Sequence, residues 1–166
     1  MGTGKTAVGR LVADRLRFDH VDTDELIEAR ARKHIRAIFE EDGEARFREY
    51  ERELVTEMAH WHKTVISTGG GIGANPIHVA SLKEHALVVC LWASPETIWE
   101  RVRKQSNRPL LNEPDPQGRI RRLLEERAPV YRQADVMLNT ERRSVQEVAQ
   151  QVIHQFRMVR RAPARV

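Results

Sequence analysis

Only one cysteine, Cys90, occurs among the 166 residues, so the chain can form no internal disulfide. No apolar run approaches the roughly eighteen residues that a membrane-spanning helix requires. The first residues contain no basic segment followed by an apolar stretch, which is the pattern of a secretory signal. These absences exclude a disulfide-rich secreted domain and an integral membrane protein, and the cytoplasm is the expected location.

Aromatic residues and clustered positive charge are also scarce. Phe, Trp and Tyr make up 5% of the chain, and its 28 Lys and Arg residues are interspersed with 24 Asp and Glu residues. A nucleic-acid-binding module would need a basic stripe and aromatic side chains that stack on bases, so this class is disfavoured despite the net charge of +4. The densest basic stretch, about residues 157–166, is interpreted as a frayed terminal tail.

The rest of the composition is that of a folded domain. Hydrophobic residues make up 40% and charged residues 31% of the chain, which excludes intrinsic disorder. A chain of 166 residues is long enough to bury a core without disulfides or a structural metal. We therefore expect residues 1–166 to form a single domain.

Hydrophobic periodicity predicts strands that alternate with helices. Apolar residues at helical spacing predict a helix over 5–16 and a long helical region from 26 to 58 that is interrupted near 42–43. A further helix is expected to begin at 94, another to run to 127, and a last one to cover about 144–156. Strand candidates fall at 18–21, 64–68, 86–93 and 136–139. The almost wholly apolar run 86–93 is typical of a strand buried on both faces of a parallel sheet. The alternation predicts an α/β domain with a mainly parallel sheet.

The strongest single motif lies at the start of the chain, where Gly-Thr-Gly-Lys-Thr at 2–6 runs directly into a helical pattern. It matches the second half of a P-loop, in which backbone N–H groups cradle phosphates, the lysine reaches the β- and γ-phosphates and the hydroxyl binds Mg²⁺. The expected nucleotide-binding residues here are Gly2, Thr3, Gly4, Lys5, Thr6 and Ala7.

The first glycine of the P-loop pattern, and the hydrophobic strand that feeds the loop, would fall upstream of Met1. One interpretation, which we favour, is that the chain begins at an internal methionine of a longer reading frame. The other is that the domain lacks a strand that is usually central, which would leave backbone groups of the neighbouring strands unpaired. A glycine-rich helix cap followed by a chance Lys-Thr is the purely structural alternative.

Two further segments follow strand candidates: Asp22-Thr23-Asp24 and Gly69-Gly70-Gly71. Because ligands of open α/β sheets bind beyond the carboxyl ends of the strands, both segments are expected at the same crevice as the P-loop. Each also has an ordinary structural explanation, since Asp-Thr-Asp is a common helix N-cap and three glycines form a tight turn. Arg48 and Arg127, each taken alone, are interpreted as surface arginines.

In combination, motifs spread over nearly the whole chain resemble the shikimate kinase family. They occur in the family's order: Gly-Thr-Gly-Lys-Thr at 2–6, Asp-Thr-Asp at 22–24, Ile38-Phe39, Gly43-Glu44, Phe47-Arg48 with Glu51, the glycines at 69–71, Asn-Arg-Pro-Leu-Leu at 107–111 and Arg-Ala-Pro-Val-Tyr-Arg at 127–132. The chain departs from the pattern at 32–34, where Arg-Lys-His replaces the usual Gly and Ser. This departure bears on the shape of the turn in the substrate-binding region.

The resemblance implies the P-loop fold of nucleoside-monophosphate-kinase-like enzymes, a parallel sheet in the order 2-3-1-4-5 whose first and central strand would precede Met1. It implies transfer of the ATP γ-phosphoryl group to the 3-hydroxyl of shikimate with Mg²⁺ as cofactor. The protein would be a monomer that binds neither nucleic acid nor a membrane. A helical substrate-binding region over about 23–60 and a lid over about 107–116 are expected.

The family's site residues carry over to matching positions of this chain. Lys5, Asp24 and Arg108 take the catalytic positions. Lys5 would stabilise phosphate charge, Asp24 would contact the attacking hydroxyl, and Arg108 would approach the phosphates from the lid. Thr6 and Asp22 take the positions that hold Mg²⁺. The remaining nucleotide-binding candidates are Arg103 and Arg143, which match the family less well.

The shikimate pocket implied by the resemblance combines arginines, glycines and aromatic rings. Arg48 and Arg127 would bind the substrate carboxylate, because guanidinium groups bind carboxylates bidentately. The glycines at 69–71 would pack against the substrate ring, and Phe39 and Phe47 would form an apolar wall. Two alternatives stay open: a gluconate-kinase-like sugar kinase with the same fold, and a catalytically impaired P-loop regulatory domain.

Overall fold

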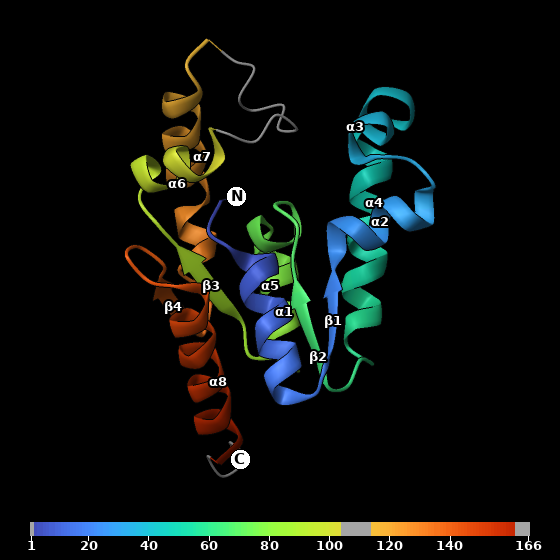
Figure 1. Ribbon diagram of the computed structural model, residues 1–166. Helices are drawn as coiled ribbons and strands as arrows, with labels where there is room; N and C mark the ends of the chain where they lie inside the picture. The colour runs from blue at the N-terminus through green and yellow to red at the C-terminus, as the bar shows by residue number, and fades with distance from the viewer. Residues whose placement is uncertain (1, 104–113, 162–166) are drawn as a thin grey trace.

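The computed structural model describes residues 2–103 and 114–161 (Figure 1). Its helices and strands, in chain order, are α1 (Lys5–Leu16), β1 (Asp19–Asp22), α2 (Thr23–Ala31), α3 (Ile35–Ala37), the π-helical turn η1 (Ile38–Asp42), α4 (Gly43–Met58), β2 (Thr64–Ser67), the 3₁₀ turn η2 (Ile72–Ala74), α5 (Pro76–Lys83), β3 (Val89–Trp92), α6 (Pro95–Val102), α7 (Pro116–Tyr131), β4 (Val136–Asn139) and α8 (Val145–Arg161). The predicted alternation of strands and helices is confirmed. Within these described residues, no helix combines the length and the apolar character needed to cross a bilayer.

Within residues 2–103 and 114–161, the strands pair into two parallel sheets of two strands each. β1 lies beside β2, with Asp19 opposite Thr64 and Asp22 opposite Ser67. β3 lies beside β4, with Val89 opposite Val136. These pairs agree with the expected order, in which the second and third strands are neighbours and so are the fourth and fifth.

An apolar cavity of ≈ 610 Å³ lies between the two sheets. Apolar side chains from β2, β3, α1 and α8 line it, among them Val65, Ile66, Val89, Leu91, Val8, Val12, Val152 and Phe156. In the described part of the chain, β2 and β3 are not paired with each other. The cavity therefore lies where the expected order places its central strand.

The prediction that the strand within 86–93 is buried on both faces is wrong. β3 is shorter than predicted, its first three residues are partly exposed, and Trp92 is 41% exposed. The physical reason is the neighbouring cavity, because Val89 and Leu91 line this space instead of packing against an adjacent strand.

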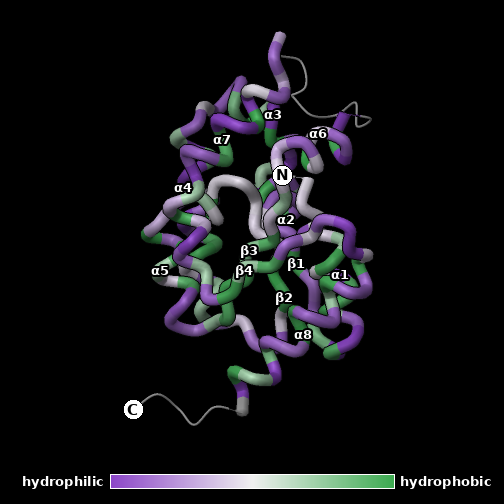
Figure 2. Tube along the Cα trace, turned by 90° about the vertical axis from the view of Figure 1, so that its left-hand side faces the viewer, coloured by the Kyte–Doolittle hydropathy of each residue, from purple (hydrophilic) through white to green (hydrophobic). Residues whose placement is uncertain are grey.

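Of the three apolar clusters among the described residues, two hold helices against the strands. Ile27, Leu54 and Ile72 are fully buried in the larger cluster, which joins α2, α4 and η2. Val8 of α1 packs with Val148 of α8 in the second cluster. Each such side chain contributes about 1.5–3 kcal/mol through burial. Figure 2 shows the hydrophobic residues gathered along the central strands and hydrophilic residues on the outer helices.

Backbone conformation at two turns explains the shape of the helical segment over about 23–60, for which substrate binding was predicted. Gly43 has φ 83° where η1 passes into α4, which confirms the predicted break near 42–43. Arg32 ends α2 with φ 53°, a left-handed conformation that glycine adopts at lower cost. The chain therefore keeps a left-handed turn at 32 although arginine stands at that position.

The terminal helix is longer than predicted. α8 ends at Arg161, so the first part of the predicted frayed tail is helical, and residues 162–166 lie outside the described residues. The guanidinium carbon of Arg160 lies 5.8 Å from the ring centre of Phe156. Basic side chains in the last turn also interact favourably with the helix dipole, which explains why the basic segment extends the helix.

Candidate active site

The start of α1 forms a ready-made anion site. Gly4 precedes the helix in a left-handed conformation with φ 88°, and no side chain caps the helix. The first turn carries no acidic residue, so its backbone N–H groups are available for an anion at the positive end of the helix dipole. Gly2 has φ 67°, and a Cβ there would lie 2.8 Å from Val102 Cγ1, so the position requires glycine.

Arg101, a residue that the sequence analysis did not select, supports this segment from α6. Its guanidinium donates to the Gly2 carbonyl at 3.4 Å, to the Thr140 hydroxyl at 2.9 Å and to the Thr140 carbonyl at 2.6 Å. These bonds join the start of the chain to the end of β4. The sequence offers no signal for them, because the partners are 39 and 99 positions away from Arg101.

The Asp22-Thr23-Asp24 segment combines a helix cap with a contact to the P-loop helix. One carboxylate oxygen of Asp22 accepts from the Asp24 N–H at 3.1 Å, and the other accepts from the Thr6 hydroxyl at 2.8 Å. Asp22 is therefore the N-cap of α2, as the structural alternative proposed, and it also brings the ends of β1 and α1 together. Two oxygen ligands of the kind that Mg²⁺ binds are thereby adjacent.

Asp24 lies close to the glycine loop, which is the segment 69–71, and the pKa of its carboxyl group is unusual. Burial, and then the nearby Asp22 carboxylate, raises the pKa of Asp24 from 3.8 to about 6, against the opposing charge of Lys5. A Cβ at Gly69 would collide with the Asp24 carboxylate, so only glycine allows this approach. A carboxyl with a pKa near 6 can accept a proton from a substrate at neutral pH.

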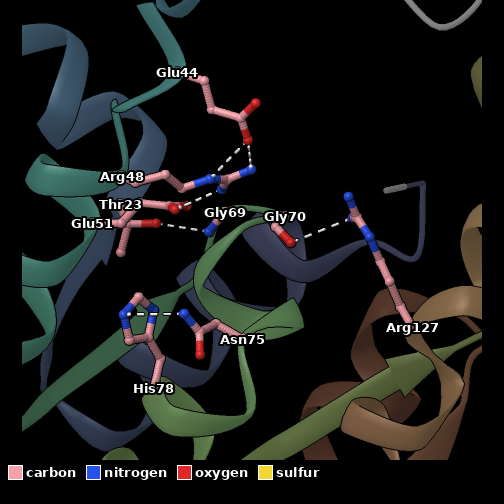
Figure 3. Close-up of polar contacts among 9 residues, drawn as sticks. All are labelled: Thr23, Glu44, Arg48, Glu51, Gly69, Gly70, Asn75, His78 and Arg127. Carbon is pink, nitrogen blue, oxygen red and sulfur yellow. Dashed lines mark hydrogen bonds and ion pairs between the residues drawn. The ribbon is translucent and has the colours of Figure 1, made fainter. Parts of the chain in front are cut away.

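Thr23 fixes the glycine loop and was not selected from the sequence. Its side chain is completely buried, and its hydroxyl accepts a hydrogen bond from the Gly69 N–H at 2.7 Å (Figure 3). Its position between two aspartates was the sequence feature that could have identified it. A threonine at that position can equally be an exposed residue of a helix N-cap or a buried hydrogen-bond acceptor. Thr23 holds Gly69 beside Asp24.

Arg48 lies on α4 at one side of the glycine loop, held by two glutamates (Figure 3). Its guanidinium donates to Glu44 at 2.8 and 3.2 Å and to Glu51 at 2.7 Å. Glu51 is only 1% exposed, and its second oxygen, Oε1, has no hydrogen-bond partner among the described residues. A Cβ at Gly71 would collide with both Arg48 and Glu51. The guanidinium orientation is therefore fixed by the chain before any ligand binds.

Arg127 reaches the same loop from α7, on the opposite side. Its guanidinium donates to the Gly70 carbonyl at 3.3 Å, and Figure 3 shows it pointing towards Gly70 from across the loop. Each taken alone, Arg48 and Arg127 fit the interpretation as surface arginines. Although both side chains are partly exposed, the fold directs them towards one segment, the glycines at 69–71.

The two predicted aromatic residues lie together next to Arg48. The rings of Phe39 and Phe47 have their centres 4.8 Å apart, with Phe47 buried and Phe39 39% exposed. The Arg48 guanidinium carbon lies 5.6 Å from the centre of the Phe47 ring. An apolar surface and a cation thus adjoin each other at the start of α4, a combination that suits a carboxylate on a hydrocarbon ring.

The predicted nucleotide-binding arginines are less closely grouped. Arg143 donates to the Asn139 carbonyl at 3.1 Å and to Gln151 at 2.9 Å, beyond the end of β4. Arg103 is exposed directly after α6. Arg108 and most of the predicted lid, 107–116, lie outside the described residues.

Comparison with known proteins identifies one family over almost the entire chain. The family model described as shikimate kinase matches residues 1–157. The shikimate kinase of Caldanaerobacter subterraneus subsp. tengcongensis is 42% identical over 156 residues, which are 94% of this chain and 91% of the relative. The shikimate kinase of Pelotomaculum thermopropionicum is 44% identical over 154 residues, covering 93% of this chain and 90% of that protein.

Solved structures agree with this result. The shikimate kinase of Acinetobacter baumannii in complex with shikimate superimposes with a TM-score of 0.89 at 32% identity, over 98% of this chain and 91% of that chain. The shikimate kinase of Aquifex aeolicus gives a TM-score of 0.84 at 33% identity, over 98% and 95% of the two chains. The described architecture is therefore that of the shikimate kinases in these comparisons.

Proposed function

The chain belongs to the shikimate kinase family, and on this premise we propose which residues bind shikimate, which bind the phosphates and which accepts the hydroxyl proton. The activity is transfer of the terminal phosphoryl group of ATP to the 3-hydroxyl of shikimate, which yields shikimate 3-phosphate and ADP. The observation that carries the assignment of residues is the position of Gly69–Gly71 between Arg48 and Arg127, with Asp24 against Gly69. This arrangement offers cations to a carboxylate and a proton acceptor to a hydroxyl.

We propose that shikimate binds with its carboxylate between Arg48 and Arg127. Two planar guanidinium groups suit a carboxylate better than ammonium groups do, because each can donate two parallel hydrogen bonds. The Glu44 and Glu51 contacts support this role, since they hold the Arg48 guanidinium in one orientation. Phe39 and Phe47 would cover one face of the substrate ring, and the glycines at 69–71 would allow the ring to approach the backbone.

Asp24 acts on the attacking hydroxyl in this proposal. The hydroxyl oxygen of shikimate forms a bond to the γ-phosphorus while the bond from that phosphorus to the β-phosphate oxygen breaks. The hydroxyl proton passes to the Asp24 carboxylate, and ADP leaves with the bonding electron pair. The raised pKa of Asp24 supports the assignment, because a base with a pKa near the working pH accepts a proton effectively.

The phosphates bind at the start of α1 in this proposal. The free N–H groups of the first turn and the Lys5 ammonium group would lie against the β- and γ-phosphates, where negative charge must be stabilised during transfer. Thr6 and Asp22 fit Mg²⁺, because their oxygens are 2.8 Å apart and Mg²⁺ bound to phosphates takes few protein ligands. Such an ion would neutralise phosphate charge.

A coupled assay of ADP release tests the proposal. Shikimate should start ADP release by the wild-type protein in the presence of ATP and Mg²⁺, and phosphorus NMR should detect one new phosphate ester. Gluconate, a linear sugar acid, is the control substrate and should give no ester. Turnover of gluconate in preference to shikimate would contradict the proposed roles of Arg48 and Arg127.

A further inference from the structure

A part-buried row of hydrogen-bonded groups lies behind the P-loop helix, on the face of α1 that packs against β1 and β2. His20 Nε2 lies 3.0 Å from the Ser67 hydroxyl, and this hydroxyl donates to the Lys5 carbonyl at 3.3 Å. Ser67 is only 4% exposed and lies opposite Asp22 in the paired strands. The contact therefore joins the last residue of β2 to the first residue of α1.

The direction of these hydrogen bonds follows from proton counting. A carbonyl oxygen only accepts, so the single hydroxyl proton of Ser67 is donated to Lys5. The hydroxyl oxygen must then accept from His20, which assigns the ring proton to Nε2. The His20 ring, the Ser67 hydroxyl and the Lys5 carbonyl thereby each have a defined hydrogen-bond partner.

Gly9 makes room for this chain of groups. A Cβ at Gly9 would lie 2.6 Å from the Ser67 hydroxyl oxygen and 3.0 Å from His20 Nε2, which is too close for any other residue. Glycine in the middle of a helix is destabilising relative to alanine. The helix carries this cost at the one position where it lets Ser67 reach the backbone of Lys5.

The Lys5 carbonyl matters because of the peptide group to which it belongs. In a trans peptide the C=O and the following N–H point in opposite directions, so the orientation of the Lys5 carbonyl sets that of the Thr6 N–H. The Thr6 N–H lies in the first turn of α1 and has no partner within the helix. It is one of the donors available to a bound phosphate.

We propose that Ser67 and His20 are positioning residues that orient the Lys5–Thr6 peptide so that its N–H binds the β-phosphate of the nucleotide. This inference rests on the proposed function, because it assumes that the start of α1 holds phosphates. The body of α1 is fixed separately by Val8 and Val12, which pack against α8. Loss of the hydrogen bonds should therefore alter phosphate binding more than it alters the fold.

Titration calorimetry with ADP tests the inference. Ser67→Ala should raise the Kd for ADP about fivefold to tenfold, the effect of one lost hydrogen bond. The KM for ATP should rise by a similar factor, whereas the KM for shikimate should stay within about twofold. Ser81→Ala, a serine substitution on α5, is the matched control and should leave all three constants unchanged.

A second pair of variants tests the contribution of His20. His20→Leu removes the donor to Ser67 and should raise the Kd for ADP about fivefold, whereas His20→Gln keeps a donor at the position of Nε2 and should stay within about twofold of wild type. This pair also decides the question if Ser67→Ala fails to fold. Equal losses in the Leu and Gln variants, or a shikimate KM that rises with the ATP KM, would overturn the inference.

The ADP titration separates this inference from the proposed function. If the wild-type protein binds ADP but does not phosphorylate shikimate, the proposed function fails while the positioning roles are still measured. If shikimate is phosphorylated and Ser67→Ala binds ADP as tightly as wild type, the positioning roles fail and the proposed function stands.

Discussion

The Thr6 hydroxyl donates a 2.8 Å hydrogen bond to Asp22, so the first turn of the P-loop helix is joined directly to the end of β1. The same carboxylate also accepts from the backbone N–H of Asp24. One side chain thereby sets the distance between the proposed phosphate site and the proposed proton acceptor. This relationship predicts that changes at Asp22 will affect Asp24.

Asp22→Asn should lower the pKa of Asp24 in the ligand-free protein, because the Asp22 carboxylate contributes to raising it to about 6. Carbon NMR titration of the Asp24 carboxyl measures the change. Since the folded state binds this proton more tightly than the unfolded state, the contribution of Asp24 makes the free energy of unfolding fall as the pH rises from 3.8 to about 6. An unchanged pKa in the variant would show that Asp22 does not influence Asp24.

Arg48→Lys should weaken shikimate binding about tenfold or more and leave ADP binding unchanged. Lysine keeps the charge but loses the planar guanidinium that Glu44 and Glu51 hold. Calorimetric titration of each ligand checks this outcome. Arg46→Lys is the control, because Arg46 lies on the same helix but pairs with Glu49 and packs over Tyr50. Equal weakening of both ligands by Arg48→Lys would indicate damage to the fold.

Gly71→Ala should weaken shikimate binding by an amount similar to Arg48→Lys, because the added methyl group would collide with Arg48 and Glu51 and displace the guanidinium. Gly73→Ala, in the adjoining turn η2, is the matched control, since its Cβ would lie 3.3 Å from only the Thr68 hydroxyl. The KM for shikimate of both variants is the measurement. Similar values for the two variants would show that the Arg48 position does not depend on Gly71.

A strand added by design ahead of Met1 should stabilise the protein by filling the cavity between β2 and β3. A segment of about ten residues rich in Val and Ile would offer N–H and C=O groups to the edges of both strands. We expect the melting temperature to rise by about 5 °C or more. A Gly/Ser segment of the same length is the control. Equal melting temperatures for the two extended proteins would contradict the expectation.

Local pattern predicted most of the fold. The periodicity of residues 5–16 and the turn chemistry near Gly43 depend on neighbours in the sequence, and the structure confirms both. The burial of β3 was predicted wrongly because it depends on which strand lies beside it. The helical conformation of residues 157–161 was missed, because a dense basic stretch after the last periodic segment suggested a frayed tail.

The candidate site was predictable where a motif has a fixed local shape, as at the start of α1 and in the glycine loop. Thr23, Ser67 and Arg101 were not predicted, because their partners lie far along the chain and are set by tertiary packing. The sequence motif included Glu51, but its nearly complete burial beneath Arg48 becomes evident only when α4 is packed against the glycine loop.

The role of Asp24 as proton acceptor is measured by comparing the rate of shikimate-dependent ADP release by Asp24→Asn with that of wild type. Asparagine keeps the size of the side chain but cannot accept the hydroxyl proton as a carboxylate does. We expect a kcat about 10²-fold or more below wild type, with the Kd for shikimate within about threefold and an unchanged melting temperature. Retention of more than about a tenth of the wild-type kcat would contradict the assignment of Asp24 as the proton acceptor.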